Sequence, residues 1–282
     1  MLGLTLIEML VAITMSSMIL LLVTSIYMTT QKNFHMQEAL SELDENARFS
    51  EELLRSSIQK SGYIGCAHLS HDLPIQNDTS YILTTNNKLT VQVGSLSDEL
   101  TIRFADTQSA SLVSPIWQSS KLTLSLHPKF NAEDIAVITD CQKAEIVRIV
   151  HVSYEANRQV ITLASPLHYS FQSSAEVSHL SIVSYFIEKT KRKKNDGSPV
   201  YSLFKKELNQ QKTELVENVE GMRLTFDVFK DGQILPKNSD NFLDSDSVMG
   251  VTAKLLLTHY ERLNLKKIVY IYIPIENEYA YV

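Results

Sequence analysis

The pattern of apolar and polar positions divides the chain into a helical part and a strand-rich part. From Leu4 to Met28 the sequence is almost wholly apolar, and Glu8 is the single charged residue in it. At about 1.5 Å per residue, a helix of this length crosses a hydrocarbon layer of ~30 Å. We therefore predict a membrane-spanning helix near the N-terminus of this sequence.

The predicted helix continues beyond the apolar stretch. Neither Gly nor Pro occurs between Leu4 and Ser61. Apolar residues recur there at spacings of mostly three, four or seven: Phe34, Met36, Leu40, Leu43, Ala47, Leu53, Leu54 and Ile58. This spacing predicts an amphipathic helix that packs one side on a folded domain and ends at Gly62. A coiled-coil stalk is the alternative, but no a/d register holds over three heptads.

After Gly62 the apolar residues alternate with a period of two, which is typical of half-buried β-strands. The predicted strands are 89–93, 99–104, 122–126, 135–139, 145–154, 159–164, 180–188, 199–207, 222–229, 251–260 and 267–275. Asn195-Asp196-Gly197 and Asp231-Gly232 predict hairpin turns. The fold class is therefore α+β: a long N-terminal helix packed on a large, mainly antiparallel β head.

The charge and the motif content of the sequence exclude several classes of function. The net charge of −6 and the isoelectric point near 5.8 argue against a general nucleic-acid-binding protein, which needs a basic face. The sequence lacks the G-x-S-x-G, H-E-x-x-H, Walker A and Gly-rich dinucleotide motifs, so we expect no enzymatic activity and no cofactor. Ser57 and Lys60 match S-x-x-K, but the partner motifs of that catalytic site are absent. The two cysteines allow one disulfide or two free thiols.

The N-terminal segment fits a cleaved signal peptide poorly, because no basic residue precedes the apolar run and no A-x-A-like site follows it. Gly3 followed by "LTLIEMLVA" instead resembles the type IV prepilin signature. The resemblance implies cleavage after Gly3 and N-methylation of Leu4. Glu8 would then meet the Leu4 amine of a neighbouring subunit, so that both charges are neutralised in a medium that tolerates neither alone.

Three further segments resemble the minor pilin family called PilW. They are "ENARFSEELLRSSIQKSGYIGC" (45–66), "DIAVITDCQKAEIVRIVHV" (134–152) and "LVENVEGMRLTF" (215–226). The resemblance implies a low-abundance subunit that primes type IV pilus assembly. The implied partners are other minor pilins, the major pilin, the prepilin peptidase, the inner-membrane assembly platform and inner-membrane lipid.

The same resemblance implies a division of the chain and a location. Residues 1–3 would be the leader, 4–30 the transmembrane and assembly half of the helix, 31–62 its amphipathic half and 63–282 the head. The protein would cross the inner membrane once, with its head in the periplasm, and then enter the pilus at or near the tip. A minor pseudopilin of a type II secretion system and a membrane-anchored binding module or adhesin are the alternatives.

In that compartment Cys66 and Cys141 would form a disulfide, because the space outside the inner membrane is oxidising. The alternative is a zinc site made of Cys66, His68 and His71 with Asp72 beside them. That cluster lacks a second ligand pair at zinc-finger spacing and would leave Cys141 unused.

Two charged clusters remain. Lys189, Lys191, Arg192, Lys193 and Lys194 precede a predicted turn, and they form either a solvated hairpin tip or a contact for an anionic partner, with DNA a weak possibility. Asp240, Asp244 and Asp246 have oxygen ligands that suit calcium, but their spacing misses the EF-hand pattern. We therefore expect a solvated loop and no metal there.

Overall fold

The computed structural model describes residues 6–66, 69, 73–77, 88–95, 97–155, 157–194, 196–208, 210–230, 232–242, 247–259 and 265–275. By its internal contacts the chain forms two compact units, Met1–Asn46 and Ala47–Val282. Helix α1 (Leu6–Ile58) provides the described part of the first unit and continues into the second. All described strands belong to the second unit. The predicted long N-terminal helix and large β-sheet head are thus confirmed.

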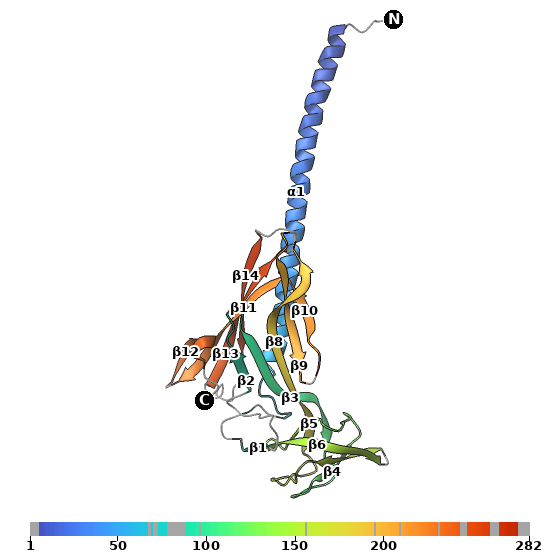
Figure 1. The fold of residues 1–282 in the computed structure, drawn as a ribbon, viewed down its shortest axis with the longest axis vertical. Helices are drawn as coiled ribbons and strands as arrows, with labels where there is room; N and C mark the ends of the chain where they lie inside the picture. The colour runs from blue at the N-terminus through green and yellow to red at the C-terminus, as the bar shows by residue number, and fades with distance from the viewer. Residues whose placement is uncertain are drawn as a thin grey trace. The chain divides into compact units, whose positions relative to one another are not determined.

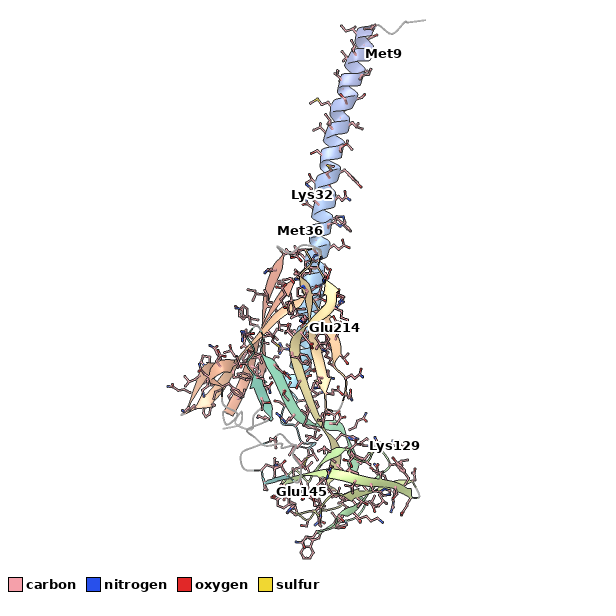
Figure 2. The ribbon with its side chains drawn as sticks, in the orientation of Figure 1. Met9, Lys32, Met36, Lys129, Glu145 and Glu214 are labelled. Atoms are coloured by element: carbon pink, nitrogen blue, oxygen red, sulfur yellow. A yellow bond between two sulfur atoms is a disulfide. The ribbon has the colours of Figure 1, made fainter. Side chains whose placement is uncertain are left out.

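In the first unit, α1 exposes the side chains of its apolar stretch. Met9, Lys32 and Met36 mark successive positions along this helix in Figure 2. The hydroxyls of Thr14, Ser17, Thr24 and Thr29 donate to backbone carbonyls three or four residues earlier, at 2.8–2.9 Å. The apolar stretch therefore satisfies these hydroxyl groups within the helix, as a hydrocarbon environment requires.

In the second unit, α1 buries one side. Ala47, Ser50, Leu54 and Ile58 are buried at helical spacing, and three of these four were predicted from the apolar pattern. Phe34, Met36 and Leu40, which we expected in the same stripe, are exposed instead. The pattern identifies an apolar side of a helix but not what covers it. The predicted end is close: α1 stops at Ile58, and Gly62 follows with a φ of 75° and donates its N–H to Arg103 O at 2.9 Å.

Ten strands form the larger sheet. They are β1 (Ile75–Asn77), β2 (Leu89–Gln92), β3 (Glu99–Ser111), β4 (Lys121–Ser125), β5 (Ile135–Thr139), β6 (Ala144–Glu155), β7 (Arg158–Leu163), β8 (Glu176–Lys193), β9 (Pro199–Glu207) and β10 (Thr213–Glu217). The main order is β10-β9-β8-β5-β6-β7-β4 (Figure 1). In addition, β3 pairs with β8, β2 with β3, and β1 with β6. The β1–β6 pair is parallel, and the other strand pairs of this sheet are antiparallel. The short β1 and β10 were not predicted.

Strand β5 lies between two hydrophobic clusters, and every residue of it is buried. Ala136 and Ile138 belong to the cluster that contains Phe130 and Phe171. The alternate residues Ile135 and Val137 belong to a second cluster, with Ile64, Leu69, Ala105, Ala144, Ile146 and Leu180. Successive side chains of a strand point to opposite faces, so this run of apolar residues fills both cores at once.

Four antiparallel strands form the smaller sheet, in the order β12 (Gln233–Asn238), β11 (Val219–Lys230), β13 (Ser247–Thr258) and β14 (Lys266–Pro274). A short 3₁₀ helix, η1 (Ser239–Asn241), follows β12. Both predicted hairpins are present: β8 and β9 join through the turn at Gly197, and β11 and β12 join through Gly232. β12 was not predicted, because its side chains are largely exposed and lack the two-residue alternation.

Two buried charges tie the sheets together within the second unit. Asp98 precedes β3, and its fully buried carboxylate accepts from Arg223 Nη1 at 2.8 Å and from the Leu224 N–H at 2.9 Å. Lys194, at the end of β8, contacts Glu220 and the hydroxyl of Thr258, which belong to the smaller sheet. A buried charge needs such partners to offset its lost hydration.

Candidate functional site

The predicted processing site lies at the start of the chain. Gly3 and Leu4 are outside the described residues, so cleavage and methylation there stay predictions. Glu8 lies in the first described turn of α1, exposed among apolar side chains. The N-terminal end of a helix favours a negative charge, since the peptide dipoles place partial positive charge there. Contact of Glu8 with another subunit is likewise untested.

The helix itself meets the requirements for membrane insertion. Among the described residues, α1 is the one helix long and apolar enough to cross a membrane by length and composition. The most apolar part of α1 is exposed throughout. Figure 2 shows its side chains projecting around the helix near Met9. Exposed apolar surface of this extent requires lipid or other protein around it.

The two cysteines are bonded to each other. A disulfide joins Cys66 to Cys141, with a Cα–Cα distance of 5.5 Å, and the predicted pairing is confirmed. Cys66 follows the end of α1, and Cys141 lies in the turn between β5 and β6 with a φ of 70°. The hydroxyl of Thr139 supports this turn: it accepts from Cys141 N and donates to Lys143 O, both at 3.2 Å. The bridge therefore fastens the segment after the helix to a turn beside the central strand β5.

The alternative metal sites gain no support from this arrangement. A thiol in a disulfide cannot provide the thiolate that zinc needs, and His68, His71 and Asp72 lie outside the described residues. Asp240 is exposed in η1, while Asp244 and Asp246 are also outside the described residues. Within the described part of the chain, no group of three potential metal ligands converges.

The basic cluster does not act as one surface. Arg192 contacts Glu217 and Glu214, and the buried Lys194 contacts Glu220. Figure 2 shows Glu214 on the β9–β10 side of the larger sheet. Lys189, Lys191, Arg192 and Lys193 are exposed, and Lys194 is the buried member of the cluster. Carboxylates of the chain thus offset at least two of the five charges, and contact with an anionic partner stays a prediction.

The S-x-x-K match has a structural explanation. Ser57 Oγ lies 2.6 Å from Tyr185 Oη, so the hydroxyl joins α1 to β8. Lys60 instead lies over the ring of Phe104, with Nζ 5.9 Å from its centroid. Burial raises the pKa of the Tyr185 phenol, and the hydrogen bond to Ser57 partly opposes that shift. Ser57 is held by a phenol, and a phenol with a raised pKa is a poor general base.

A pocket on the exposed face of the smaller sheet was missed by the sequence reasoning. Its volume is about 610 Å³, and Arg223, Lys254 and Tyr270 are among its lining residues. The alternating "KIVYIYIPI" pattern does contain a signal for it. The exposed positions of that strand carry Tyr270 and Tyr272, where solvent-facing positions usually carry small polar or charged residues.

Buried Glu145 could suggest a second site, but its contacts are structural. Glu145, labelled in Figure 2, belongs to β6, and its buried carboxylate accepts from the N–H groups of His168 and Tyr169 at 2.9–3.2 Å. His168 Nδ1 is 2.9 Å from the same carboxylate. Glu145 therefore fixes the loop after β7 and needs no ligand.

The chain was compared with models of protein families, with curated proteins and with solved structures, and no match was found in any of the three.

Proposed function

We propose that the chain is a minor pilin of the PilW type, which primes type IV pilus assembly by packing its N-terminal helix against the helices of other pilin subunits. In this proposal it is a structural subunit with no catalytic role. It crosses the inner membrane once, exposes its head to the periplasm and then enters the pilus near the tip. The support is the quoted sequence resemblance together with the surface of α1.

The length of the exposed apolar surface carries the proposal. A hydrocarbon layer of ~30 Å needs about 20 helical residues. In α1 large apolar side chains are exposed from Leu6 to Met28, then again at Phe34, Met36 and Leu40, and at Phe49 in the second unit. Lipid alone accounts for the first group. The later positions favour a helix that also packs against other helices along its side.

Glu8 gives such packing a register. A carboxylate in hydrocarbon costs several kcal/mol unless an opposite charge pairs with it. In the proposed assembly, the amine of Leu4 from a neighbouring subunit provides that charge. Because the pair forms at one axial offset only, it selects one position of the incoming helix, as a buried polar residue selects register in a coiled coil.

The head fits an extracytoplasmic location. Disulfides persist in oxidising compartments and are rare in the cytosol. The Cys66–Cys141 bridge closes a loop with a sequence separation of 75 residues. On the chain-entropy model such a loop contributes roughly 4 kcal/mol to the stability of the head.

The test is the N-terminus of the mature protein. We expect mass spectrometry of membrane-extracted protein to find a chain that begins with methylated Leu4, and we expect the same chain in pili sheared from cells. An intact Met1, or a cut near residue 30, would refute the prepilin assignment. Processing at Gly3 with recovery in a secretion pseudopilus, and none in pili, would refute the pilus assignment.

A matched pair of variants sharpens the test. Gly3→Val should block cleavage, since the peptidase must approach the backbone where glycine has no side chain. Leu2→Val places the same side chain one residue earlier and should still be cut. Cleavage of the Gly3→Val protein at Leu4 would contradict the proposal.

A further inference from the structure

The pocket on the smaller sheet is built from the side chains of its solvent-facing side. The core-facing residues Leu224, Ala253 and Ile271 are buried. The residues that alternate with them along the strands point to the opposite, solvent-facing side of the sheet. The pairing register sets two rows across the strands: Asn238, Thr225, Thr252 and Tyr272 in one, and Arg223, Lys254 and Tyr270 in the next. Figure 1 shows β11, β13 and β14 running together in this sheet.

A loop held by Arg223 closes one side of the pocket. Arg223 Nη1 donates to Gly94 O at 2.9 Å, and Nη2 donates to Ser95 O at 2.6 Å. The same guanidinium pairs with the buried Asp98. A Cβ added at Gly94 would lie 2.2 Å from Ser97 O, so this tight loop requires glycine. Arg223 thus positions the loop, and its charge is already offset.

Lys254 and Tyr270 give the pocket its chemical character. Tyr270 is 66% exposed, and Lys254 Nζ lies 5.6 Å from the centroid of its ring. Among the described residues, Lys254 has no carboxylate within ion-pair distance. An exposed aromatic ring with a cation over it offers apolar surface and one anion-binding group.

The remaining lining groups are neutral or acidic. Thr225, Thr252 and Asn238 present hydroxyl and amide groups, and Asp240 presents a carboxylate. A nucleic-acid strand would need several uncompensated cations along its backbone, whereas of the two cations that line this pocket Arg223 is already paired with Asp98 and Lys254 alone remains. A ligand with many hydroxyls and a single negative charge matches the set better, since hydroxyls can donate to Asp240 while a carboxylate meets Lys254.

We propose that this pocket binds an acidic saccharide, in which a pyranose ring lies on Tyr270, its carboxylate contacts Lys254, and its hydroxyls contact Thr225, Asn238 and Asp240. A cavity of about 610 Å³ is in the range of small-molecule sites. The site lies wholly within the second unit, so the inference stands whether or not the helix assembles into a pilus.

The test is a titration of the full-length protein in detergent micelles with 3′-sialyllactose, which carries one carboxylate, followed by saturation-transfer NMR. We expect binding of this probe and weaker binding of lactose, its neutral counterpart. Tyr270→Ala and Lys254→Gln should each reduce affinity at least about tenfold. Tyr270→Phe keeps the ring and should retain most of the affinity, and Tyr154→Ala, at another exposed tyrosine, should retain all of it.

Each other outcome would overturn the proposal. Equal affinity for lactose would remove the role of Lys254, and equal binding by the Tyr270→Ala protein would place the sugar elsewhere. Binding of a six-residue oligothymidylate without binding of the saccharide would replace this ligand class by a nucleic acid. Absence of binding at millimolar probe, with wild-type circular dichroism, would refute the site. Failure of pilus assembly in other experiments would leave all of these readings unchanged.

Discussion

The two units of this protein treat apolar side chains in opposite ways. In the first unit, the described residues of α1 from Leu6 to Met28 expose their large apolar side chains. In the second unit, apolar side chains fill the cores around the two sheets, and β5 is buried along its whole length. Burial of apolar surface is the main favourable term in folding, so the second unit obtains it from its own chain.

The apolar stretch of α1 from Leu6 to Met28 must obtain the same free energy from its surroundings. Lipid tails or neighbouring helices can cover a helix whose backbone groups are already bonded internally. The apolar stretch of α1 therefore needs lipid or other protein around it, whereas the second unit fills its cores with its own side chains. Each prediction below therefore changes one unit and measures whether assembly or folding responds.

The largest effect is expected from Glu8→Gln. Membrane insertion and cleavage at Gly3 should persist, but incorporation into pili should fall by about two orders of magnitude or more, since removal of one member of a buried pair costs about 3–5 kcal/mol. Immunodetection of the protein in sheared pili measures this. Glu38→Gln, on the same helix outside the apolar stretch, is the control, and normal incorporation of the Glu8→Gln protein would show that Glu8 is no assembly contact.

Loss of the disulfide should affect the second unit alone. Cys66→Ser is expected to lower its free energy of unfolding by about 2–4 kcal/mol, because the unfolded chain regains the freedom of the closed loop. Urea unfolding in detergent, followed by circular dichroism of the β structure, measures the change. Membrane insertion should be unaltered. Rapid alkylation of both cysteines in the native wild-type protein would contradict the pairing.

Asp98→Asn should destabilise the junction of the two sheets by about 2–3 kcal/mol. The substitution places an amide donor against the buried N–H of Leu224 or leaves Arg223 without its counter-charge. Asp227→Asn, on the half-exposed face of β11, is the control and should change stability little. Equal urea midpoints for the Asp98→Asn and wild-type proteins would show that this tie is dispensable.

The smallest effect is expected at the contact between α1 and β8. Tyr185→Phe removes the hydrogen bond to Ser57 and should cost about 1 kcal/mol at neutral pH. Burial raises the pKa of the Tyr185 phenol in the folded protein above its value of about 10 in the unfolded chain. The neutral phenol therefore stabilises the folded state fully at pH values below about 10. This stabilisation is lost as the pH rises through the pKa of the folded state.

The Tyr185→Phe protein should therefore unfold with less dependence on pH in the alkaline range than the wild type. Thermal unfolding between neutral and alkaline pH measures this, with the exposed Tyr270→Phe as the control. Identical alkaline slopes for the Tyr185→Phe and wild-type proteins would contradict the raised pKa.

The long helix, most of the strands and two hairpin turns could be predicted from the amino-acid sequence. Local signals suffice for these elements: the absence of Gly and Pro between Leu4 and Ser61, the apolar residues of strands such as Ile135–Thr139, and glycine at Gly197 and Gly232, where φ is positive. The short strands β1, β10 and β12 were not predicted, because segments of three to six residues with few buried positions show too little periodicity.

Which distant residues contact each other could not be predicted in this way, because it depends on the fold of the whole head. Asp98 and Arg223 are 125 residues apart, and Lys194 and Glu220 are 26 apart on different sheets. The order of the strands brings these pairs together, and it also assembles the Tyr270 pocket from four strands, the helix η1 and the loop after β2. Local propensity acts over a few residues, whereas such contacts depend on the strand pairing of the whole head, so a charge that reads as solvated in the sequence, as Lys194 does, becomes buried in the fold.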